Sequence, residues 1–156
     1  MLVMRALVGL APGLAVLTAV AGCAVGSSAT GADEARALTA PLEQASSAVA
    51  SATLATELLG DDRASAAVTD TALLDQVHVL EEAADAVATF VPADPTGAGW
   101  QADALAAVRD AQLAVAGARG WANHAGAEEA TVVAALDASA GVLDDLTATL
   151  DEVTGR

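Results

Sequence analysis

The chain of 156 residues contains no Lys, no Ile and no Tyr, and it has a single Cys and a single Phe. One Cys excludes both a disulfide framework and a zinc site built from several cysteines of the same chain. The 6 basic residues are all Arg and face 21 acidic residues, which gives a net charge of -15. Because nucleic-acid binding needs a basic surface, we expect no nucleic-acid partner.

Alanine is the abundant residue, with 43 copies, and it supplies much of the 54% hydrophobic content. This content is too high for a wholly disordered chain, and the length fits one domain, with or without a tail. The sequence therefore predicts a single folded body whose Leu and Val residues are interspersed with Ala.

The first 22 residues differ from the rest because they carry no acidic residue. Arg5 precedes an apolar run from Ala6 to Ala21, an order typical of a secretory signal. The run has 16 residues, fewer than the roughly 20 that a membrane-spanning helix requires. We therefore expect residues 1–22 to be an export signal.

The apolar run ends in Val20-Ala21-Gly22-Cys23, which resembles the lipobox of bacterial lipoproteins. In that class the Cys sulfur receives a diacylglycerol, cleavage falls before the Cys, and the Cys becomes the new N-terminus. The resemblance implies lipidation of Cys23 and attachment to the extracytoplasmic face of the cell membrane. Ala19-Val20-Ala21 also fits ordinary signal cleavage, which would release a soluble protein. No family is recognised for the remainder.

We expect residues 23–38 to form the lipidated Cys and a flexible tether, because the segment begins with small residues. Its part from Asp33 onward also suits a helix. In residues 39–156, apolar residues recur every three or four positions, which predicts helices. Gly60, Pro92 and Gly126 separate four of them. The predicted helices span about 39–59 (Pro41 in the first turn), 61 or 62 to 91 (Asp61 or Asp62 as N-cap), 100–124 and 127–153.

Each predicted helix carries one apolar stripe that should face a core. The stripes are Leu42, Ala45, Val49, Ala52, Thr56, Leu59; Leu73, Val77, Leu80, Ala84, Val87, Val91; Leu105, Val108, Gln112, Val115; and Leu136, Ala140, Leu143, Leu146, Leu150, Val153. Short loops make consecutive helices antiparallel, so we expect an all-α, antiparallel up-down-up-down four-helix bundle. The alternative is a three-helix bundle with residues 60–69 as a loop. The many Ala residues predict close helix approach and little interior room.

In this topology the first and third loops meet at one end of the bundle. That end should hold four acids, a Trp and a His: Asp61, Asp62, Trp121, His124, Glu128 and Glu129. Such a group can bind a divalent cation or a basic partner. The acids also suit a structural role at predicted helix N-termini, where negative charge complements the helix dipole, and we favour that role.

The second His is His78, which shares a helix face with Asp75 and Glu82. These residue types suit a surface metal site, but an exposed acidic face is the simpler interpretation. We therefore expect no cofactor, and the alternative is a divalent metal ion. Trp100 and Phe90 should lie at the end of the bundle opposite the first and third loops. There they either cover the end of the hydrophobic core or contact the bilayer interface.

For catalysis the sequence offers no phosphate-binding glycine loop, no nucleophile elbow and no Ser with a His-plus-acid pattern. Our leading hypothesis is a membrane-anchored, non-catalytic binding or accessory module. Its expected contacts are membrane lipid, through acylated Cys23, and an envelope protein or a cation. The alternatives are a small metal-binding or metal-handling bundle and a structural envelope spacer. The sequence leaves the oligomeric state open.

Overall fold

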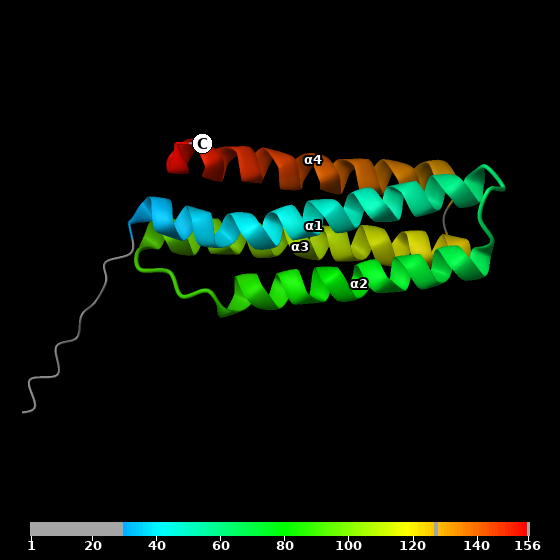
Figure 1. Ribbon diagram of the computed structural model, residues 1–156, viewed down its shortest axis with the longest axis horizontal. Coiled ribbons are helices and arrows are strands. Elements are labelled where there is room, and N and C mark those ends of the chain that lie inside the picture. Colours follow the sequence, from blue (N-terminus) through cyan, green and yellow to red (C-terminus); the bar gives the residue numbers. More distant parts are fainter. Residues whose placement is uncertain (1–29, 127, 156) are drawn as a thin grey trace, which may run out of the picture.

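The computed structural model describes residues 30–126 and 128–155. This part consists of four helices: α1 (Gly31–Gly60), α2 (Ala66–Thr89), α3 (Pro95–Ala122) and α4 (Glu129–Thr154). Figure 1 shows them side by side, with consecutive helices running in opposite directions. The predicted up-down-up-down four-helix bundle is confirmed, and the three-helix alternative is wrong.

The four helices do not pack as a square. α1 and α3 contact each other across the bundle and also contact both remaining helices, whereas α2 and α4 do not contact each other. Small residues on the buried faces allow the backbones of α1 and α3 to approach closely. The buried alanines on these two helices are Ala35, Ala45, Ala48, Ala52, Ala104, Ala107, Ala111, Ala114, Ala118 and Ala122.

The large core residues are mainly Leu and Val from the predicted stripes. Those with no exposed surface include Leu42, Val49, Leu73, Leu80, Val87, Val108, Val115, Leu136, Leu143 and Leu150. Two stripe positions at helix ends were predicted wrongly. Val91 is 84% exposed because α2 has already ended, and Val153 is 41% exposed in the last turn of α4.

The first helix begins earlier than the sequence analysis placed it. Thr30 is its N-cap and forms a capping box, in which the Thr30 side chain accepts from the Asp33 backbone and the Asp33 carboxylate accepts from the Thr30 backbone. Residues 31–38 are therefore helical rather than part of a tether. Pro41 lies inside α1, not in its first turn. Its ring removes the hydrogen bond to the carbonyl of Ala37, which is exposed.

The starts of α2, α3 and α4 also differ from the predicted ones. Ser65, not Asp61 or Asp62, is the N-cap of α2 and accepts from the backbone of Val68. Asp94 is the N-cap of α3, which starts at Pro95, five residues before the predicted Trp100. Glu128 is the N-cap of α4. For α2 and α3 a short polar side chain that accepts a backbone hydrogen bond sets the start, followed by Pro95 in α3.

The bundle has two ends with different contents (Figure 1). We call "terminal end" the one that holds the start of α1, the end of α4 and residues 90–94. We call "tip" the other end, which holds the loops at residues 61–65 and 123–128, described apart from residue 127. Within the described part, none of the helices is long and apolar enough to cross a membrane.

Candidate functional site

The predicted lipidation residue, Cys23, lies outside the described residues, as do residues 1–22. Lipidation therefore stays a prediction from the sequence. The structure does describe the regions for which a cation or a basic partner was considered.

The tip brings its two loops together as the topology predicted. A hollow of about 270 Å³ lies between them, and its lining includes Asp62, His124, Glu129 and Trp121. Asp61 and Glu128 are exposed and do not line this hollow. The structure thus gathers only part of the predicted acid and His group around one space.

Asp62 and His124 occupy equivalent positions, just beyond the C-termini of α1 and α3. Both adopt a left-handed backbone, with φ of 57° and 58°. At each site two backbone hydrogen bonds close a Schellman turn: Arg63 N to Leu58 O and Asp62 N to Leu59 O after α1, and Ala125 N to Gly120 O and His124 N to Trp121 O after α3. Glycine is the usual residue at this position, because a side chain is disfavoured there.

These turns correct the predicted role of two acids. Asp61 and Asp62 follow the C-terminus of α1, where the helix dipole disfavours negative charge, rather than opening α2. Glu128 and Glu129 do lie at the N-terminus of α4, as expected. The favourable position at a helix N-terminus therefore accounts for Glu128 and Glu129 but not for Asp61 and Asp62.

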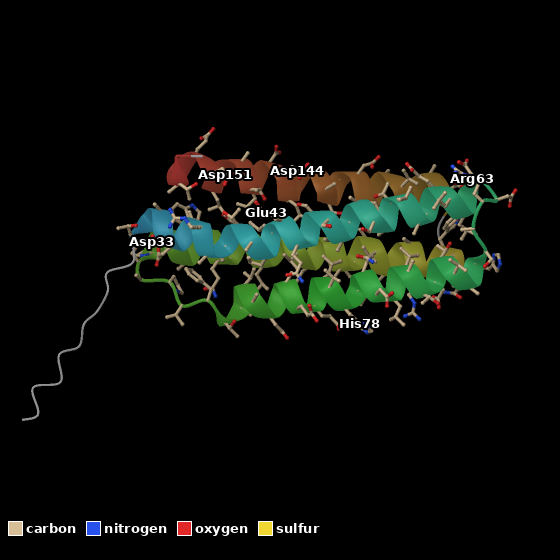
Figure 2. The ribbon with its side chains drawn as sticks, viewed as in Figure 1. Asp33, Glu43, Arg63, His78, Asp144 and Asp151 are labelled. Carbon is tan, nitrogen blue, oxygen red and sulfur yellow. The ribbon has the colours of Figure 1, made fainter. Side chains whose placement is uncertain are left out.

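The second candidate group lies on the outer surface of α2. Asp75, His78 and Glu82 are all exposed, and Figure 2 shows His78 directed away from the other helices. The amide Nε2 of Gln44 on α1 lies 3.5 Å from Glu82 Oε2 and donates to it. The Glu82 carboxylate is therefore turned toward α1.

Neither candidate group forms a preassembled metal site. Within residues 30–126 and 128–155, no three His, Cys, Asp or Glu side chains come close enough together to hold a metal ion. This covers both Asp75, His78 and Glu82 and the acids and His124 at the tip.

A polar network near the tip was not predicted from the sequence. Asp70 Oδ1 accepts from Arg119 Nε at 2.7 Å and from Asn123 Nδ2 at 2.6 Å, and so joins the first turns of α2 to the end of α3. The Arg119 hydrogen bond, followed by that of Asn123, lowers the pKa of Asp70. Nothing in the sequence singled out Arg119 or identified its partner among the 21 acidic residues.

Glu34 is a second unpredicted polar contact, at the terminal end. Its side chain is only 2% exposed, and Oε1 accepts a hydrogen bond from the backbone N–H of Ala93. Its other oxygen, Oε2, is buried without a hydrogen-bond partner beside Gly97. Glu34 thus ties the first turn of α1 to the connection between α2 and α3.

The aromatic residues of the terminal end pack on the core. Phe90 and Trp100 are partly buried against it, and the Trp100 ring lies beside Gly31 at the start of α1. This arrangement supports the interpretation that Trp100 closes the end of a thin Ala-rich core.

Comparisons with known proteins add no functional assignment. No protein-family model matches the chain, and no similar protein was found among curated proteins or solved structures.

Proposed function

We propose that the protein is a lipoprotein anchored at the extracytoplasmic face of the cell membrane, with the helical bundle serving as a non-catalytic binding or accessory module. The observation that carries the proposal is Val20-Ala21-Gly22-Cys23 at the end of an acid-free apolar segment. The single Cys of the chain stands where a lipobox requires a thiol, because only a thiol can form the thioether to diacylglycerol.

The position of the bundle relative to Cys23 is compatible with an anchor at the terminal end. Only seven residues, 24–30, separate Cys23 from α1, and a chain of that length spans at most about 25 Å. α1 has 30 residues and is therefore about 45 Å long. In the anchored protein the tip would lie at the far end of the bundle from the lipid.

Charge supports attachment through lipid rather than through the protein surface. After residue 22 there are five Arg and 21 acidic residues, a net charge of -16. Such a body is repelled by anionic headgroups. Stable attachment of a protein takes two acyl chains, which is what a diacylglyceryl group on Cys23 supplies.

A binding role is supported by large apolar side chains on the outer surface of the bundle. Val68, Leu113 and Val142 are between 50% and 72% exposed. Exposed apolar residues that gather beside one another mark interaction surfaces. Leu113 and Val142 do so, because they line the same groove between α3 and α4.

The experiment that tests the proposal is mass spectrometry of the protein extracted from membranes of cells that express the full chain. We expect loss of residues 1–22 and a diacylglyceryl adduct on Cys23. The Cys23→Ser variant should leave the membrane fraction or stay as an uncleaved precursor. An unmodified N-terminus at Gly22 would instead show ordinary signal cleavage and contradict the anchor.

A further inference from the structure

An apolar groove lies between α3 and α4. It consists of two adjoining hollows of about 390 Å³ and 410 Å³, which share Asp110 and Val142. Its buried lining residues are small: Ala107 and Ala114 on α3 and Ser139 on α4. The small floor residues leave a trough along which a further element can pack.

Two large apolar side chains line this trough. Leu113 on α3 is 72% exposed and Val142 on α4 is 50% exposed. Leu113 is exposed because it does not belong to the stripe of α3 residues that faces the core. The two side chains offer apolar surface that a partner would remove from water.

The groove is also acidic. Asp103 and Asp110 on α3 and Asp145 on α4 line it, and among the described residues its lining includes no basic side chain. An apolar floor with carboxylates beside it is complementary to a surface that presents apolar residues flanked by positive charge.

We propose that this groove docks an amphipathic helix of a partner protein, with apolar residues on one face and Arg or Lys on both sides of that face. The inference rests on the proposed function, since it specifies the surface and the partner chemistry of the binding module. The lining runs from Asp103 to Ala114 on α3 and from Ala135 to Thr149 on α4, about 16 Å and 21 Å of helix axis. These lengths match a partner helix of about 12–14 residues.

A helix is favoured over an extended peptide because the groove lies between two helices that run alongside each other. A third helix can place residues at spacings of three and four into such a groove, in the manner of helix-in-groove recognition. A second copy of this chain is disfavoured, because the same three aspartates would face each other. Anionic lipid is disfavoured by the same charge.

The test measures binding of a fluorescent peptide of about 14 residues, with leucines on one helical face and arginines on both sides. The protein is the full chain purified from membranes into nanodiscs of zwitterionic lipid, with empty nanodiscs as the blank. We expect saturable binding that weakens as salt rises. A peptide of the same composition in scrambled order, and one with Glu in place of Arg, should bind at least about tenfold more weakly.

Two matched pairs of variants locate the binding site. Leu113→Ser should weaken binding about fivefold or more, whereas Leu54→Ser, at a position on α1 that is 57% exposed, should leave it unchanged. The charge variants keep equal net charge: the groove set neutralises Asp103, Asp110 and Asp145 to Asn, and the control set neutralises Asp85, Asp137 and Asp144 to Asn. The groove set should weaken binding about tenfold and the control set less than about threefold. Melting curves should show that all variants remain folded.

Several outcomes would overturn the inference. Equal loss in the two charge sets would show attraction to the overall negative charge only, and unchanged binding in Leu113→Ser would place the site elsewhere. Dimerisation through Leu113, seen by sedimentation, would identify a second copy as the occupant. Mass spectrometry of the same preparation keeps the two proposals separate. An anchored protein that does not bind the peptide contradicts docking alone, whereas groove binding by a protein without lipid contradicts the anchor alone.

Discussion

The terminal end of the bundle is closed mainly by side chains, whereas the tip combines two backbone turns with the Ser65 cap and the contacts of Asp70. At the terminal end Thr30 and Asp94 cap two helices, and Glu34 accepts from the backbone of Ala93. The Gln101 amide adds hydrogen bonds to carbonyls that end α2, at 2.9 Å to Val87 O and 2.8 Å to Phe90 O. At the tip, Schellman turns end α1 and α3, and the N-cap of α4 has no side-chain hydrogen bond.

This difference predicts how the two ends respond to mutation. An end closed by buried side chains depends on the shape and charge of a few residues, since each partner left unpaired in the interior costs stability. An end closed by backbone turns depends on conformation and tolerates changes of exposed side chains. Under the proposed function, the more specific closure lies at the end beside the lipid anchor.

Two glycines, one at each end, allow the most direct test of this contrast. A Cβ on Gly97 would overlap the carboxylate of Glu34, which is buried, whereas a Cβ on Gly60 would overlap the carboxylate of Glu129, which is exposed. Gly97→Ala should cost about 1–3 kcal/mol, a fall in Tm of about 5 °C or more. Gly60→Ala should be neutral or slightly stabilising, because Glu129 can rotate away and Ala favours the helix. Thermal melts of both variants measure the difference.

A double-mutant cycle sharpens the interpretation. Glu34→Ala should itself cost about 1–3 kcal/mol, because the N–H of Ala93 loses its partner. In that background Gly97→Ala should cost far less than in the parent, since the overlap is gone. Equal destabilisation by Gly97→Ala in both backgrounds would contradict the proposed overlap. Equal effects at Gly97 and Gly60 would contradict the contrast between the ends.

The second prediction concerns the backbone of the tip. Asp62→Gly and His124→Gly should each stabilise the protein by about 0.5–1 kcal/mol, because glycine adopts the left-handed conformation without steric cost. Asp61→Gly is the control, since Asp61 has an ordinary φ of -81° and should gain nothing. Urea unfolding of the three variants checks the prediction, and a gain at Asp61 as large as at Asp62 would refute it.

The sequence determined the architecture better than the helix boundaries. The spacing of Leu and Val predicted four helices, and short loops predicted that the tip loops would meet. The early start of α1 was given only as an alternative, a helix from Asp33 onward, although Thr30 and Asp33 are three residues apart, the spacing of a capping box. Gly60 was taken as the stop signal, but the left-handed residue is Asp62, a residue type that adopts this conformation less often than glycine does.

The polar contacts and the groove were harder to predict for a different reason. Glu34 has Ala, Asp and Arg as sequence neighbours, which is typical of a solvent-exposed helix face. It is nevertheless buried, and it contacts the backbone at Ala93, far away in the sequence. Asp70 pairs with Arg119 across 49 residues, and most acids of the chain were equally plausible partners. The groove depends on which alanines of α3 and α4 face each other, and an Ala-rich helix has little periodicity to reveal this.

A third, smaller effect is expected at the start of α4. Glu128 is the N-cap but makes no side-chain cap hydrogen bond, because its side chain is longer than those of preferred caps. Glu128→Asp keeps the charge and shortens the side chain, and it should stabilise the bundle by about 0.5 kcal/mol. Asp94→Glu at the terminal end is the converse control, and it should destabilise by a similar amount because the bond to Gly97 N is lost. Chemical denaturation that shows both changes in the same direction would contradict this account.

The smallest expected effects on stability come from substitutions of Asp33 at the terminal end and Asp70 near the tip. Their dependence on pH and salt identifies the cause of each effect. The hydrogen bond from the Thr30 side chain is the main cause that lowers the pKa of Asp33 below its ordinary value of 3.8. For Asp70 the main cause is the hydrogen bond from Arg119. A carboxyl whose folded pKa is lowered stabilises the fold above its unfolded pKa, and this stabilisation is lost as pH falls through the folded value. Asp33→Asn and Asp70→Asn should therefore lower Tm relative to the parent at pH 7 and progressively less as pH falls below 3.8.

Salt distinguishes the two residues by degree. Each makes an ion pair, Asp33 with Arg36 and Asp70 with Arg119, but the hydrogen bonds with Thr30 are the leading causes of the lowered pKa of Asp33, whereas Arg119 is the leading cause for Asp70. Raising the salt concentration to about 0.5 M should shrink the effect of Asp70→Asn more than that of Asp33→Asn, since screening weakens exposed ion pairs. Each variant is compared with the parent at the same pH and salt, so the general relief of acidic repulsion cancels. A loss of Tm in Asp70→Asn that is the same at pH 3 and pH 7 would mean that the shape of this side chain, rather than its charge, joins α2 to α3.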